Sequence, residues 1–197
     1  MNTLLKSAGG ITQVSADSRL LSNRLIFLEG KIDAGSAGEF VRQILILNQE
    51  STEKAIRVLV NSAGGEISSG LMIYDAIQGS RAPVALYCIR HAYSMAAVIV
   101  ACGSHGRYIL PHGEMMIHEP MLGQQVAGNS SSIRSISEGL LEMKGRINRL
   151  LAKHTKRSEE EIEKATAYDH FFSPEESVEF GLCDEIVGFE KILEPIL

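Results

Sequence analysis

Apolar residues in the first half of the chain alternate between short runs and longer stretches with helical spacing. The runs at residues 24–28, 56–60 and 84–89 are rich in aliphatic and β-branched side chains, as in buried strands. Between them, residues 37–49 and 67–77 carry apolar side chains three or four positions apart, which predicts amphipathic helices. This alternation predicts an α/β fold with a mainly parallel sheet covered by helices.

The third run leads into a second apolar segment, and Ser94 lies at the junction. Residues 95–102 are apolar on every side, which predicts the start of a fully buried helix. On this stretch alone, Ser94 is best explained as the N-cap of that helix, a common use of serine. The alternative is a hydroxyl that faces a cleft at the carboxyl edge of the sheet, beside N–H groups that could stabilise an oxyanion.

Two other places could contribute to such a cleft. A strand is predicted at residues 115–118, so His118 falls at its end, although a lone histidine there is more often part of the core or its rim. Gly64 and Gly65 lie between a strand and a helix, where paired glycines let the backbone approach a ligand with its N–H groups exposed. Taken alone, a glycine pair in a turn is a weak signal.

The second half of the chain contains the longest helical pattern. From Ile133 to Leu151, apolar residues recur at three- and four-residue steps, and this stripe is too long for a small sheet to bury. A core helix is the simpler interpretation. A helix that contacts another subunit is preferred, because a glycine- and serine-rich loop precedes it. Helix starts are predicted at Ser158 and Ser173, and Asp169 lies between them, a position typical of a turn or cap residue.

Composition narrows the class of protein. The 197 residues are 45% hydrophobic, enough for one substantial core, and the net charge of −5 argues against a nucleic-acid or acidic-membrane partner. No apolar run approaches the ~20 residues that span a bilayer. Cys88, Cys102 and Cys183 indicate reduced thiols of a cytosolic protein, two of them inside apolar runs. The Cys and His spacing does not suggest zinc, and we expect no metal.

Four segments, in this order, carry a family resemblance: VNSAGGEISSGLMIYDAI, AYSMAA, MMIHEP and FFSPEESVEFGLCDEIV. Together they resemble the ClpP family, the proteolytic subunits of Clp-type ATP-dependent proteases, over about residues 18–187. The resemblance implies a crotonase-like (ClpP-type) α/β fold with a protruding strand and helix, the handle, at about residues 121–155. We therefore expect one ClpP-like peptidase domain at residues 18–197. Residues 1–17, small and polar without a sustained period, are expected to form a mobile N-terminal arm.

The same resemblance assigns a serine endopeptidase site. Acyl transfer to serine needs a base, a carboxylate that orients the base, and fixed donors for the oxyanion. The resemblance implies that Ser94 is the nucleophile, His118 the base and Asp169 the carboxylate. The N–H groups of Gly65 and Met95 match the family's oxyanion donors.

Partners and location are also implied by the resemblance. Members of the family act on unfolded polypeptide inside stacked heptameric rings, in the cytoplasm, and a separate AAA+ unfoldase uses the ATP. The peptidase itself is expected to need no cofactor. Two alternatives stay open: a low-activity or structural subunit of a mixed ring, and a crotonase-like CoA hydratase or isomerase. The second alternative would leave the serine, histidine and aspartate idle.

Several positions depart from the family pattern. Near the nucleophile, Arg90 and Tyr93 replace small residues and are expected to narrow the site, while Glu119 follows His118 where glutamine is usual. The family usually has aromatic side chains on the surface that receives unfoldase loops, and the matching positions here are Arg57, Leu59 and Gly79. The family's arginine just before the triad aspartate is replaced by Tyr168. Since such pockets depend on a few aromatic contacts, we expect poor docking to an unfoldase alone and a second, more typical ClpP-like subunit beside this one.

Overall fold

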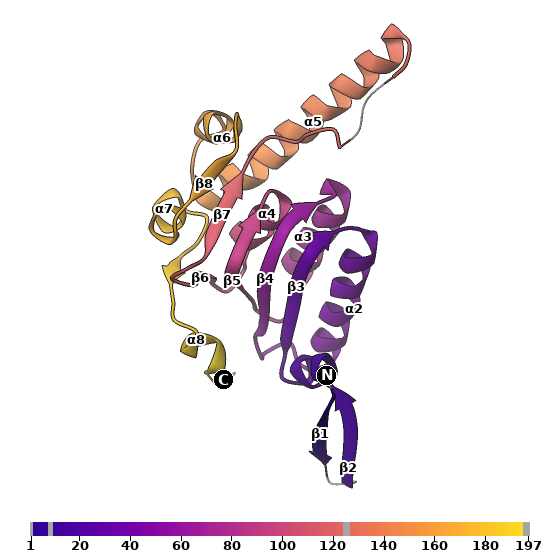
Figure 1. Cartoon of the computed structure of the whole chain (residues 1–197), viewed down its shortest axis with the longest axis vertical. Coiled ribbons are helices and arrows are strands. Elements are labelled where there is room, and N and C mark those ends of the chain that lie inside the picture. The colour runs from indigo at the N-terminus through magenta and orange to yellow at the C-terminus, as the bar shows by residue number, and fades with distance from the viewer. Residues whose placement is uncertain (1, 8–9, 124–126, 195–197) are drawn as a thin grey trace.

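The computed structural model describes residues 2–7, 10–123 and 127–194, and a seven-stranded sheet forms its middle layer (Figure 1). Strands follow the order β3-β4-β5-β6-β9, with β7 paired to β5 and to β8. All pairs are parallel except β7 with β8, which confirms the mainly parallel sheet. The strands are β3 (Leu25–Ile32), β4 (Ile56–Gly65), β5 (Val84–Tyr93), β6 (Arg107–Ile109), β7 (Glu114–Ile117), β8 (His170–Phe172) and β9 (Glu185–Ile186).

The main core lies between one face of the sheet and three helices, α2 (Ala34–Glu50), α3 (Ile67–Gly79) and α4 (Met95–Ala101). Helix α2 begins at Asp33, whose carboxylate accepts from the N–H groups of Gly35 and Ser36. Its buried side chains recur at helical spacing: Ala37, Phe40, Ile44 and Leu47. Full burial of each large side chain contributes roughly 1.5–3 kcal/mol, so this stripe holds α2 against the sheet.

The opposite face of the sheet carries a smaller cluster. Its buried members are Leu59, Ala85, Tyr87, Val187 and Ile192. Ile192 comes from α8 (Glu190–Leu193), which follows β9. The C-terminal segment therefore covers part of the outer face of β4 and β5.

Helix α5 (Ser130–Thr155) runs away from the body of the molecule (Figure 1). Its C-terminal part belongs to the core, where Ile147 and Leu151 are buried. Further toward its N-terminus the same stripe is in solvent, with Ile133 48% and Ile136 38% exposed. The core interpretation therefore holds for the C-terminal half of the stripe, while contact of the exposed half with another subunit stays a prediction. The described residues just after Pro120, 121–123, form no strand, and the rest of the expected handle strand at 124–126 lies outside the described residues.

Two short helices and a strand complete the edge of the sheet that carries the predicted site residues. Helix α6 (Glu159–Thr166) begins at Ser158, and α7 (Pro174–Phe180) begins at Ser173, both with reciprocal capping boxes. These starts confirm the two helices predicted from the sequence. Strand β8, between them, had not been predicted.

The N-terminus contains regular structure that the sequence pattern did not indicate. β1 (Asn2–Ser7) and β2 (Gly10–Ser15) pair as an antiparallel hairpin, and α1 (Ala16–Ser22) follows. That residues 1–17 form a mobile arm stays a prediction. The hairpin projects at the end of the molecule opposite to α5 (Figure 1). Within the described ranges, no helix is both long and apolar enough to cross a membrane.

Candidate active site

Three neighbouring strands bring the predicted site residues to one edge of the sheet. Ser94 follows β5, His118 follows β7, and Asp169 precedes β8. Because β7 runs parallel to β5 and antiparallel to β8, the end of β5, the end of β7 and the start of β8 lie together. The structure thus joins three residues that are far apart in the sequence.

Ser94 and His118 are hydrogen-bonded. His118 Nε2 lies 2.7 Å from Ser94 Oγ. Ser94 occupies the N-cap position of α4, as the sequence indicated, but its side chain makes no cap hydrogen bond with the described backbone, so capping does not account for the hydroxyl. Its backbone has φ +55° and ψ −124°, a conformation that strains a residue with a Cβ and costs about 1–3 kcal/mol.

Asp169 lies on the other side of the imidazole. Its Oδ1 atom is 3.4 Å from His118 Nδ1, longer than the 2.7–3.2 Å typical of a hydrogen bond. The His118 side chain is 11% exposed, whereas that of Asp169 is 60% exposed. The carboxylate is therefore in reach of the imidazole, with room to approach it further.

Gly65 and Met95 lie beside Ser94, at the end of β4 and the start of α4. A Cβ on Gly65 would lie 2.0 Å from the carbonyl oxygen of Ile32, so only glycine fits there. The N–H of Glu66 donates to that carbonyl at 2.8 Å. Gly65, Ser94 and Met95 line one common cavity, so the backbone of Gly65 lies near the Ser94 hydroxyl.

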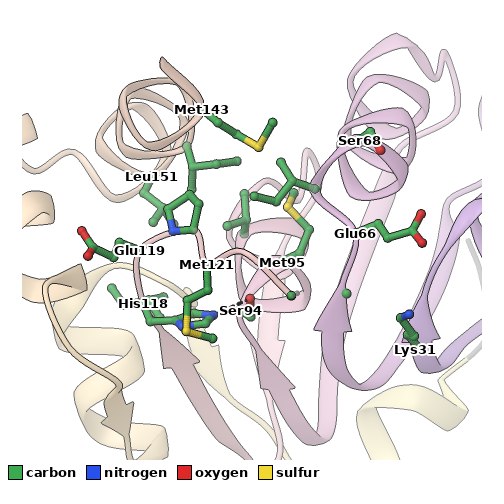
Figure 2. Close-up of a pocket in the computed structure, with 17 residues that line it drawn as sticks. Lys31, Glu66, Ser68, Ser94, Met95, His118, Glu119, Met121, Met143 and Leu151 are labelled. Carbon is green, nitrogen blue, oxygen red and sulfur yellow. Dashed lines mark hydrogen bonds between the residues drawn. The ribbon is translucent and has the colours of Figure 1, made fainter. Parts of the chain in front are cut away.

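A cavity of about 460 Å³ opens over these residues (Figure 2). Ser94 lies between His118 on one side and Lys31 and Glu66 on the other. The apolar lining of the cavity comes from α4, β7 and the C-terminal half of α5: Met95, Val98, Ile117, Met143, Ile147 and Leu151. This volume and this mixture of apolar walls with a few polar groups are typical of a binding site for a small ligand or an extended peptide.

Arg90 and Tyr93, which replace small residues of the family pattern, do not lie where the sequence led us to expect them. Among the described residues that line the cavity there is neither Arg90 nor Tyr93, so the expectation that they narrow it is wrong. Tyr93 OH donates to the Glu114 carboxylate, and its ring packs edge-on against Phe171 at 5.6 Å. Tyr93 therefore links β5 to β7 and β8 on the side away from the cavity.

The three cysteines are buried, which argues against a role as nucleophiles. Desolvation raises the pKa of Cys88 and of Cys102 to about 12, and burial raises the pKa of Cys183 as well. Thiols in this state are poor nucleophiles at neutral pH, as expected of structural cysteines. In the part of the chain that the structure describes, no three His, Cys, Asp or Glu side chains are grouped as a metal site.

Comparison with known families agrees with the resemblance seen in the sequence. The family model described as Clp protease matches residues 8–190 of the 197. The match includes the hydrogen-bonded Ser94 and His118 and the adjacent Asp169. This chain belongs to the Clp protease family, and its α/β architecture, with a parallel sheet covered by helices, is that of a ClpP-type peptidase.

Proposed function

We propose that this chain is a serine endopeptidase in which Ser94, His118 and Asp169 form the catalytic triad. The observation that carries the proposal is the 2.7 Å contact between His118 Nε2 and Ser94 Oγ at the floor of the cavity. A serine in a strained backbone conformation, hydrogen-bonded to a histidine, is the arrangement expected of an activated nucleophile.

The chemistry follows from these positions. His118 Nε2 accepts the proton of Ser94 as Oγ attacks a peptide carbonyl carbon, and the resulting oxyanion is stabilised by the N–H groups of Gly65 and Met95. His118 then gives the proton to the leaving amine, so the peptide bond breaks and an acyl-serine remains. Water attacks that ester with His118 again as base. Asp169 keeps Nδ1 protonated and stabilises the imidazolium.

The substrate we propose is unfolded polypeptide, cut inside a chamber of stacked heptameric rings in the cytoplasm. The exposed stripe on α5 supports this assembly, because Ile133 and Ile136 leave apolar surface unburied in a single chain. An AAA+ unfoldase would supply ATP-driven unfolding, and the peptidase reaction itself would need no cofactor.

The test is Ser94→Ala, with Ser104→Ala as a matched control because Ser104 is exposed and lies outside the cavity. We expect Ser94→Ala to abolish hydrolysis of a fluorogenic peptide and labelling by a fluorophosphonate probe, without changing the thermal melting profile. Ser104→Ala should be labelled and active like the natural protein. Peptidase activity that survives Ser94→Ala would refute the assignment. Intact Ser94 that neither reacts with the probe nor cleaves peptides would favour a structural subunit.

We further propose that this subunit works beside a second, more typical ClpP-like subunit. The supporting observation is at the outer face of the sheet, in a cavity of about 570 Å³ lined by Phe27, Leu59 and α8. There the Arg57 guanidinium donates to the carbonyl groups of Ile192 and Glu194, so a charge fixes the C-terminal segment where the family has an aromatic surface. An unfoldase loop would have to compete with this segment.

A reconstitution experiment tests the mixed assembly. The purified chain is combined with an unfoldase from the same cell and a folded substrate, first alone and then with a second ClpP-like subunit. We expect ATP-dependent degradation only in the second mixture. Efficient degradation in the first mixture would refute the proposal.

A further inference from the structure

A lysine on α5 joins two acidic side chains from different parts of the chain. Lys144 Nζ lies 2.8 Å from Glu119 Oε2 and 3.2 Å from Glu163 Oε1, and we call this group the Lys144 clamp. The Lys144 side chain is only 23% exposed, less than either acidic partner. The hydrogen bond to Glu119, followed in size by the one to Glu163, raises the pKa of Lys144, so the lysine keeps its positive charge throughout the neutral range.

Both acidic partners belong to segments that carry triad residues. Glu119 directly follows His118, and its carboxylate points away from Ser94 toward the outside of the cavity (Figure 2). Its backbone N–H donates to the carbonyl of Thr166 at 2.8 Å. Thr166 ends α6, the helix of Glu163, and is fully buried. The clamp and this backbone hydrogen bond therefore both connect the His118 segment to α6.

The position of the end of α6 affects the position of Asp169. Only two residues separate Thr166 from Asp169, so a shift of α6 relative to the His118 segment moves the carboxylate directly. The Asp169 side chain is largely exposed and stands 3.4 Å from the imidazole, too far for a hydrogen bond to fix its position. Its position therefore depends on the backbone on either side: β8, which pairs with β7 from His170 on, and the end of α6 before it.

We propose that Lys144 is a positioning residue for the active site: by joining Glu119 to Glu163 it holds Asp169 in reach of His118. This inference rests on the proposed catalytic triad. Without the ammonium group, two carboxylates would face each other with no cation between them, and their repulsion would separate α6 from the His118 segment. The walls of the cavity that come from β4, α3 and α4 would stay in place, so the loss should fall mainly on kcat.

The experiment compares Lys144→Met with Lys144→Arg, which keeps a cation, and with Lys164→Met. Lys164 is the matched control because it also pairs with a glutamate at 2.8 Å, and among the described residues this partner is Glu160 on its own helix alone. For each variant, sedimentation and thermal melting verify the particle, and a fluorogenic peptide gives kcat and KM. Misplacement of a catalytic group by about 1 Å can cost 100-fold, so we expect Lys144→Met to lower kcat about 10- to 100-fold. Lys144→Arg should recover most of it, and Lys164→Met should have no effect.

The same substitution is then made in an Asp169→Asn background. If Lys144 acts through Asp169, Lys144→Met should lower kcat much less there than in the natural protein, because coupled residues are not additive. A purely structural role would give equal losses in both backgrounds, and that result would overturn the proposal. Unchanged kcat in Lys144→Met, or an equal loss in Lys164→Met, would also overturn it.

Two controls keep the result interpretable. If Lys144→Met does not fold, Glu163→Gln breaks the α6 arm alone. It should lower kcat several-fold, and the absence of this loss would count against the clamp. Activity that survives Ser94→Ala would mean that the proposed triad is wrong. Inactive Ser94→Ala together with fully active Lys144→Met would reject the clamp and leave the triad intact.

Discussion

Gly65→Ala tests whether the close approach of β4 to β3 serves catalysis. The new Cβ would lie 2.0 Å from the carbonyl oxygen of Ile32 and 2.8 Å from its carbonyl carbon. Carbon and oxygen atoms in such contacts normally stay about 3.3 Å apart, so the two backbones must separate by about 1 Å. The contact is with backbone, and no side-chain rotation can relieve it.

Two losses should follow from that separation. The hydrogen bond from Glu66 N–H to Ile32, now 2.8 Å long, would weaken at a cost of about 1 kcal/mol of folding stability. The N–H of Gly65, the proposed oxyanion donor, would be displaced with the backbone, and loss of one such donor lowers kcat by about 10²- to 10³-fold. We therefore expect a modest fall in melting temperature with a large fall in kcat.

The matched control is Gly79→Ala, at the end of α3, where a Cβ would meet no atom within 4 Å. Alanine is favoured over glycine in a helix by about 0.5–1 kcal/mol, so this variant should melt slightly higher and keep its peptidase activity. Thermal melting and steady-state kinetics on a fluorogenic peptide measure both quantities. A folded Gly65→Ala protein with unchanged kcat would refute the role given to this N–H.

Three other perturbations separate parts of the argument. Ile136→Glu, in the exposed half of the α5 stripe, should yield smaller particles in sedimentation with an unchanged fold. Ile147→Glu should instead unfold the chain, because Ile147 is 4% exposed and a buried unpaired carboxylate is costly. Since burial raises the pKa of the cysteines, the unfolded state releases thiol protons first, and the free energy of unfolding in urea with a reductant should fall as pH rises above about 8.5. Ser94→Gly should be inactive yet unfold at a higher urea concentration than Ser94→Ala, because glycine adopts φ +55° without strain.

Local patterns predicted most of the sheet and the helices that cover it. Helix starts at Ser158 and Ser173 were predicted because the cap serine and the glutamate three residues later satisfy each other's backbone groups, which is a local interaction. The strand at His170–Phe172 was missed because it is too short for an alternating pattern. It is a strand through its pairing with β7, where Ile117 is opposite His170. Such tertiary pairing leaves no periodic signal in the sequence.

The candidate site was less accessible to local patterns than the fold. Ser94 fitted an N-cap as well as a nucleophile, and only its hydrogen bond to His118 separates the two. The requirement for glycine at position 65 comes from Ile32, on another strand. Lys144 was not anticipated at all, because its contacts with Glu119 and Glu163 depend on how α5 crosses α6. The assignment of Ser94, His118 and Asp169 to one site came from the family resemblance, because their spacing in the sequence does not indicate it.

The strained conformation of Ser94 connects the stability of the fold to its chemistry. A strained residue persists only where its surroundings hold it, and here the N–H of Ser94 donates to Met116 on β7 at 2.8 Å. From the other side, Gly64 packs so closely that a Cβ there would lie 2.6 Å from the carbonyl oxygen of Tyr93. The strand that precedes His118 and the glycine turn that precedes Glu66 therefore both hold the serine in its turn. The contacts that offset the strain come from the same segments that carry the proposed base and the proposed oxyanion donor, so a change that relaxes Ser94 is expected to disturb those groups as well.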